Sequence, residues 1–484
     1  MVALDEIALL DATAQAEHLR RGDVSPSELL EAAIARLERC NGQLNAVTAP
    51  ALDRARAAVR TATLTGPFGA LPFLMKDLGG QEAGAPYTAG MRFLKEAGWL
   101  EKTDSFLTQR FREAGLISLG RTNTPELGLL PTTEPQAFGP TRNPWNLAYS
   151  AGGSSGGAAA AVAAGIVPLA HASDGGGSIR IPASMCGLVG LKPTRGRNSF
   201  GPGLGERWNG LSSEFAVTRS VRDAAHLLDA TSGAMPGDPY FAAPPPRSYA
   251  SMVVEAPPRL RIGFATTGPN GAAVHAECRA AVQLGARLLA DAGHTVEESH
   301  PEAFDDPQNP AAYVDIVASN TARALAVWGE AVGRAVVEPD VEALTWQMAE
   351  RGRSLSAADL LARLEYTHRL GRRLATWWDS GFDIFLTPTV GAPPPPIGHL
   401  SSTPDEPFRG LIRAAPFGMF TLPFNMSGQP AISVPLYWTR DETAGLPIGC
   451  QLVARYGRED LLLQVAAQLE QIQPWADRRP ALAA

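Results

Sequence analysis

The sequence has little of what would place it in a specialised class of protein. Only four cysteines occur among 484 residues, at positions 40, 186, 278 and 450. None belongs to a Cys-x-x-Cys pair, so their spacing indicates neither a zinc site nor a disulfide framework. No basic block is present and the formal net charge is −7, which argues against binding to nucleic acid or to an anionic membrane. We therefore expect no metal, no cofactor and no nucleic-acid or membrane partner.

Long hydrophobic runs are also missing. The first 22 residues contain no basic segment followed by an apolar one, so no secretory signal is indicated and a reducing cytoplasm is the expected location. Residues 143–173 lack Lys, Arg, Asp and Glu, but their apolar part, 158–170, contains Gly165 and Pro168. This part is too short to span a bilayer. A buried helix at 158–164 and a strand at 166–171 are expected there instead.

What the chain does contain is an alternation of helical and strand patterns. Residues 25–28, Ser-Pro-Ser-Glu, form a capping box that begins a helix. Residues 105–114 predict a helix followed by a strand, and 259–298 predict strand, helix and strand. Such alternation predicts an α/β fold, and the length allows one large core or several lobes.

Three local features carry the chemistry. They are the segment Gly-Gly-Ser-Ser-Gly-Gly at 152–157, the segment Asp-Gly-Gly-Gly-Ser-Ile-Arg at 174–180, and the lysine that ends an apolar run at 71–76. Successive glycines leave backbone N–H groups uncovered, so several can converge on one oxygen and form an oxyanion hole. Ser178 directly follows such glycines and is well placed to attack the same carbonyl.

Serine needs a partner that accepts its proton. Lys76 can do so only when it is neutral, and burial can lower a lysine pKa from about 10.4 by roughly 3 to 5 units. Its apolar neighbours Phe73, Leu74 and Met75 favour burial. Ser154, which precedes an alanine-rich helix, is the candidate relay between the amine and the nucleophile.

Two other interpretations of the glycine-rich segments stay open. The first is a phosphate-binding loop, although residues 152–157 lack the lysine that such a loop contains. The second is a nucleophile elbow. Residues 152–156 fit a nucleophile elbow with Ser154 as the attacking group of an α/β-hydrolase-type esterase. That motif needs a preceding strand, whereas residues 143–151 resemble a loop, and it leaves 174–178 unexplained. His171 is expected to be a packed histidine.

The segment from Gly152 to Ala183 resembles the signature of the amidase signature family at every constrained position. Further similar segments are residues 71–78, 120–126, 142–144, 190–196, 386–389 and 424–435. The resemblance covers nearly the whole chain. It implies an α/β/α sandwich with a central mixed, twisted β-sheet covered by helices, and hydrolysis of amide-type C–N bonds.

The resemblance also implies a Ser–Ser(cis)–Lys triad, which falls on Ser178, Ser154 and Lys76, with a cis peptide bond at Ser154. Around it, the family pattern assigns the oxyanion hole and a supporting ion pair. The oxyanion hole falls on the backbone N–H groups of Gly175, Gly176, Gly177 and Ser178, and the supporting pair on Asp174 and Arg180. Gly175 departs from the pattern, because several relatives carry isoleucine or another side chain there.

The resemblance implies a single domain, residues 1–484. Within it we expect a helical N-terminal part (1–65), a catalytic core (66–240), a variable region that sets specificity (241–400) and a C-terminal part that completes the core (401–484).

The ends and the middle of the chain look most similar to the branch of 6-aminohexanoate cyclic-dimer hydrolases, with aryl acylamidases and urethanases as wider relatives. Linear, cyclic or aryl amides and carbamates are therefore the expected small-molecule substrates. An alternative from another class is a glutaminase A subunit of a tRNA-dependent amidotransferase, although no charge pattern favours tRNA. The sequence leaves the oligomeric state open, a homodimer included.

Overall fold

A computed structural model describes residues 4–441 and 445–483 of the chain. Its centre is a single 11-stranded sheet within these residues, with the spatial order β1-β3-β2-β6-β8-β7-β12-β13-β11-β9-β10. The strands of this sheet are β1 Val47–Pro50, β2 Leu71–Lys76, β3 Leu116–Thr122, β6 Leu169–Asp174, β7 Val189–Lys192, β8 Ser213–Thr218, β9 Arg261–Phe264, β10 Thr295–Glu298, β11 Ile384–Pro388, β12 Ala431–Trp438 and β13 Pro447–Ala454. A separate two-stranded sheet joins β4, Arg142–Asn143, to β5, Asn146–Ser150.

The central sheet is mixed. Strand β2 is parallel to both of its neighbours, β3 and β6, and β9 is parallel to β10 and β11. The strands from β6 to β11 across the middle pair antiparallel. Each of the four predicted sequence regions contributes strands to this one sheet. The expected α/β architecture with a central mixed sheet is thus confirmed.

Helices cover both faces of the sheet. On one face lie α7, Gly156–Ala163, and α8, Arg180–Cys186, and on the other α9, Val221–Thr231, α11, Ala276–Asp291, and α18, Glu459–Ile472. Adjacent residues of β13 show this division. A side chain at Gly449 would meet Ser184 of α8, whereas the Cys450 thiol donates to the Ala281 carbonyl of α11.

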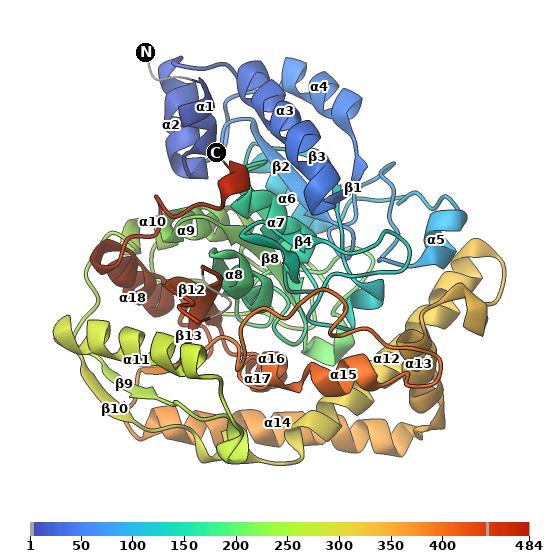
Figure 1. Ribbon diagram of the computed structural model, residues 1–484, viewed down its shortest axis with the longest axis vertical. Helices are drawn as coiled ribbons and strands as arrows, with labels where there is room; N and C mark the ends of the chain where they lie inside the picture. The colour runs from blue at the N-terminus through green and yellow to red at the C-terminus, as the bar shows by residue number, and fades with distance from the viewer. Residues whose placement is uncertain (1–3, 442–444, 484) are drawn as a thin grey trace.

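The remaining helices lie around this sandwich (Figure 1). Helices α1 to α4 cluster at the N-terminal end, and the capping box at Ser25 is present at the start of α3. Helices α12 to α14 run along the opposite end of the molecule. The bounds of the remaining helices are α1 Leu4–Leu9, α2 Ala12–Arg21, α3 Pro26–Leu44, α4 Leu52–Thr61, α5 Arg92–Glu96, α6 Phe106–Glu113, α10 Tyr249–Met252, α12 Asn309–Val332, α13 Ala343–Ser354, α14 Ala357–Asp379, α15 Arg409–Arg413, α16 Ala415–Gly418 and α17 Leu422–Ser427.

The uncharged segment 143–173 forms a buried helix and strand, as predicted. Every residue of α7 is buried, but the following strand, expected at 166–171, is β6 at Leu169–Asp174. Gly165 has a left-handed φ of +72°, and Pro168 lacks a backbone N–H. The turn after α7 therefore takes up three more residues than its apolar composition suggests. None of the described helices combines the length and the apolarity that crossing a bilayer requires.

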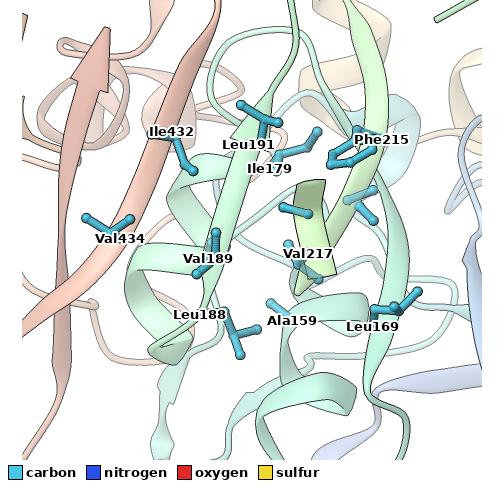
Figure 2. Close-up of a cluster of buried hydrophobic side chains, with 14 of the residues drawn as sticks. Ala159, Leu169, Ile179, Leu188, Val189, Leu191, Phe215, Val217, Ile432 and Val434 are labelled. Atoms are coloured by element: carbon cyan, nitrogen blue, oxygen red, sulfur yellow. The ribbon is translucent and has the colours of Figure 1, made fainter. Parts of the chain in front are cut away.

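A dense apolar core supports the centre of the sheet (Figure 2). Phe215 and Val217 of β8 lie in one buried cluster with Val189 of β7 and Ala159 of α7. Ile179, the residue directly after Ser178, is part of the same cluster and is fully buried. The segment that carries Ser178 is thereby anchored in the core.

Phe215→Ala tests this core. Phe215 is 0% exposed, so its removal leaves a cavity, and we expect the free energy of unfolding to decrease by about 3–5 kcal/mol. Phe241→Ala, at a phenylalanine that is 73% exposed, is the matched control and should leave the unfolding midpoint in urea nearly unchanged. Equal shifts for the two variants would contradict the assigned core.

Candidate active site

Lys76 is the last residue of β2 and its side chain is fully buried. Strand β2 lies between β3 and β6, which points the lysine toward the loops that follow the strand ends. Its Nζ lies 2.7 Å from Ser154 Oγ and 2.9 Å from Ser173 Oγ. The structure therefore joins two of the three predicted triad residues, and it adds Ser173, which the sequence analysis did not identify.

The environment of Lys76 favours the neutral amine. Burial lowers its pKa from 10.5 to about 7, while the carboxylates of Glu214 and Asp174 raise it and Arg207 lowers it further. The loss of hydration is the larger effect. A substantial fraction of this lysine is therefore uncharged at neutral pH.

Ser154 lies between β5 and α7, and the peptide bond between Gly153 and Ser154 is cis, as the resemblance implies. A side chain at Gly153 would collide with the backbone of Thr132, so the chain passes closely here. The segment before Ser154, expected to be a loop, contains the short strand β5. This strand is not part of the central sheet, and Ser154 Oγ lies against a lysine, which disfavours the nucleophile-elbow interpretation.

Ser178 lies in the loop between β6 and α8. Its backbone carbonyl accepts a hydrogen bond of 3.3 Å from the Ser155 N–H, so the two serine-bearing loops are in direct contact. The residue is 9% exposed. The structure thus holds Ser178 beside the Ser154 segment with limited access to solvent.

The supporting pair is a fully buried ion pair. Arg180 Nε lies 2.9 Å from Asp174 Oδ2, and the arginine also donates to Gln451 Oε1 at 2.8 Å. Asn425 Nδ2 donates to Asp174 Oδ1 at 2.9 Å. Burial alone would raise the pKa of Asp174, but Arg180 and the hydrogen bonds hold it well below its usual range. This network ties the loop that carries Ser178 to α17 and β13.

The glycine strip, defined here as Gly175 to Gly177, differs in one respect from the prediction. The Gly177 N–H donates to Asp174 Oδ1 at 2.7 Å, so it is already engaged and does not favour an oxyanion role. Among the described residues, no protein acceptor is found for the N–H groups of Gly175, Gly176 and Ser178. These three donors are the better candidates, and the role of the strip stays a prediction.

His171 is a packed histidine. It is fully buried, and its Nδ1 accepts the Lys76 backbone N–H at 3.2 Å. Its Nε2 lies 3.6 Å from Glu214 Oε2. The side chain therefore helps to position β2, and its contacts are with Lys76 and Glu214 and not with the two predicted catalytic serines.

A cavity of about 370 Å³ is lined by neighbours of these groups, although none of the predicted catalytic residues is itself part of its lining. Leu127, one of its lining residues, precedes Gly128, and a side chain at Gly128 would lie 3.1 Å from Ser154 Oγ. Trp208, a second lining residue, packs over Gly175. Further lining residues are Leu78, Tyr87, Asn320 and Trp328. A larger cavity of about 540 Å³, lined by Arg54, Glu82 and Arg112, likewise contains none of the predicted catalytic residues, and its lining does not include Trp208 or Leu127.

Sequence reasoning missed Ser173, Trp208 and Asn425. Ser173 and Asn425 stand within the similar segments 152–183 and 424–435, but nothing in the local pattern shows that they meet Lys76 and Asp174, and Trp208 stands in no motif. Trp328 of α12 also lines the cavity, whereas Trp377 and Trp378 lie in the core.

Comparison with known proteins gives a consistent result. The family model described as Amidase matches residues 28–463. The chain is 45% identical to a 6-aminohexanoate-cyclic-dimer hydrolase from Pseudomonas sp. (strain NK87), over 98% of this chain and 96% of that protein.

Two solved structures have the same fold. A structure of 6-aminohexanoate cyclic dimer hydrolase complexed with substrate matches with a TM-score of 0.95 and 44% identity, covering 99% of this chain and 100% of that one. A bacterial aryl acylamidase of the amidase signature family matches with a TM-score of 0.87 and 28% identity, over 97% and 98% of the two chains.

Arg180→Met tests the buried ion pair. The change leaves the Asp174 carboxylate buried without its cation, so we expect the free energy of unfolding at pH 7 to decrease by about 3–5 kcal/mol. Arg247→Met, which breaks an exposed pair with Glu255, is the control and should leave the urea midpoint nearly unchanged. A stable Arg180→Met protein would show that the pair does not hold the loop.

Proposed function

Because the chain belongs to the amidase signature family, we propose that it hydrolyses small amides through an acyl-enzyme formed on Ser178. The observation that carries the proposal is the buried Lys76 amine, 2.7 Å from Ser154 Oγ, next to a loop that bears a second serine. A neutral amine, a relay hydroxyl and a nucleophile are the parts that serine activation needs.

The proposed reaction proceeds in two halves. Lys76 takes the proton of Ser154, which takes the proton of Ser178 as its Oγ attacks the substrate carbonyl carbon. Backbone N–H groups of Gly175, Gly176 and Ser178 hold the negative oxygen of the tetrahedral intermediate. Ser154 returns the proton to the leaving nitrogen as the C–N bond breaks. Water then attacks the acyl group by the reverse proton route and frees the acid.

The similarity to 6-aminohexanoate-cyclic-dimer hydrolase and the mostly apolar cavity beside the site support aliphatic amides as substrates, linear or cyclic. Aryl amides and carbamates present the same kind of carbonyl to the same groups. A screen of purified protein with 6-aminohexanoate oligomers, anilides and small carbamates tests this choice, with product amines measured by mass spectrometry. We expect the aliphatic amides to be turned over fastest; a preference for carbamates would make the chain a urethanase.

The proposal assigns all catalytic groups to this one chain and places it in the cytoplasm, in keeping with four buried cysteines that form no disulfide. Amide turnover by the purified chain alone would support this. Activity that appears only with an added partner and tRNA would instead favour the amidotransferase A-subunit interpretation.

Ser178→Ala should lower kcat/KM for an aliphatic amide by about 10⁴-fold or more, because the attacking oxygen is removed. Ser380→Ala, at a serine that bonds within the end of α14, should retain full activity. A fluorophosphonate probe provides an independent measurement: intact-protein mass spectrometry should show one adduct on the parent protein and none on Ser178→Ala. Labelling of Ser154 instead would contradict the assigned nucleophile.

The pH dependence of kcat/KM should report Lys76. Only the neutral amine accepts a proton, so the rate should fall as pH decreases below about 7, the pKa to which burial lowers this lysine, and reach a plateau in mildly alkaline solution. The measurement is kcat/KM from pH 5.5 to 9 with a substrate whose chemical step is rate-limiting.

Glu214→Gln is the matched variant for this profile. The Glu214 carboxylate raises the pKa of Lys76, so its neutral replacement should shift the acidic limb to lower pH. Lys76→Ala should retain the fold but lose nearly all activity. Full activity of Lys76→Ala at pH 7, or a flat profile from pH 6 to 9, would contradict lysine as the base.

A further inference from the structure

The absence of a side chain at Gly175 makes room for an indole. A Cβ added at this residue would lie 2.7 Å from both Cε3 and Cζ3 of Trp208, a distance that real Cβ atoms do not tolerate. The φ of Gly175 lies outside the left-handed region, so its backbone would accept an ordinary residue. The indole, and not the conformation, is therefore what chiefly requires glycine here, with Ser212 Oγ as the next contact at 3.0 Å.

The loop that carries Trp208 is held in place from two sides. Trp208 and Asn209 both have a φ of +52°, a conformation that costs non-glycine residues free energy and recurs at functional sites. Asn320 Nδ2 of α12 donates to Asn209 Oδ1 at 2.7 Å. Asn425 Nδ2 donates to the Leu211 carbonyl at 3.0 Å, and the same amide group bonds to Asp174.

The indole consequently lies between the glycine strip and the 370 Å³ cavity. It covers the first glycine of the strip, and it lines the 370 Å³ cavity together with Leu127 and Asn320. Gly175 lies three residues before Ser178 in the same loop. We therefore expect the group bound to a carbonyl that Ser178 attacks to pass along Trp208 when it enters the cavity.

We propose that Trp208 is a specificity-determining residue, seated by Gly175, that selects amides whose chain is unbranched next to the reacting carbonyl. A methylene chain fits along a flat indole face, whereas a branch at the adjacent carbon overlaps the ring. This inference rests on the proposed function, since it concerns the substrate of the same site.

A double-mutant cycle at positions 175 and 208 tests the pair, with kcat and KM measured for hexanamide and for its 2-methyl derivative. Gly175→Ala displaces the indole and should lower kcat/KM for hexanamide by about 100-fold, the effect of a shift of about 1 Å in an active site. Trp208→Ala should raise the preference for the branched amide over hexanamide by about tenfold. The double variant should have the same kcat/KM and the same preference between the two amides as Trp208→Ala, because the methyl group added at position 175 then meets no indole ring.

Gly177→Ala is the matched control, since a methyl group there meets Ile181 and Thr421 and the φ of +131° disfavours a side chain. Its loss of activity should not be relieved by Trp208→Ala. Trp208→Phe serves as the second variant if Trp208→Ala does not fold, with a smaller change of preference in the same direction.

Additive effects of Gly175→Ala and Trp208→Ala, or an unchanged preference between the two amides, would overturn the inference. The Ser178→Ala assay keeps this result separate from the proposed function. Activity in Ser178→Ala refutes the nucleophile, whereas an essential Ser178 with an additive cycle refutes only the assignment of Trp208.

Discussion

The chemistry proposed for this chain depends on an amine that the fold removes from water. Lys76 has no exposed surface, and burial lowers its pKa from 10.5 to about 7. The folded state binds this proton more weakly than the unfolded chain does, so the lysine destabilises the fold increasingly as pH falls from about 10.5 to about 7, by about 5 kcal/mol at most. The core of the central sheet has to offset that cost.

Much of the structure around Lys76 serves to bring hydroxyl groups to the amine. Ser173 reaches it from the neighbouring strand β6, and Ser154 from the loop before α7. Helix α7 can lie this close because its residues are small. A side chain at Gly157 would lie 2.5 Å from the backbone nitrogen of Asn123. The alanine and glycine content that resembles a membrane segment in the sequence is therefore the packing condition that brings Ser154 to Lys76.

The sequence was most informative where residues of the proposed site stand in a local sequence motif. Lys76, Ser154 and Ser178 each stand in a recognisable motif, and the alternation of helices and strands predicted the α/β architecture. It was least informative about contacts between distant segments. Trp208 meets Gly175 across 33 positions, and Asn425 reaches Asp174 across 251. No periodicity or propensity in either segment encodes such a meeting, because the sheet order that creates it is a property of the whole chain.

The glycine strip shows how one short segment can satisfy several constraints together. Gly175 gives space to the indole of Trp208, and a side chain at Gly176 would overlap the hydroxyl group of Tyr313 from α12. Gly177 has a φ of +131° and donates to Asp174. A need for exposed backbone N–H groups does not by itself explain three consecutive glycines, since residues with side chains also have a backbone N–H. The strip is glycine throughout because side chains from distant parts of the chain, among them Trp208, Tyr313 and Thr421, approach it closely. Residues far from Ser178 in the sequence can therefore shape the space beside the proposed nucleophile.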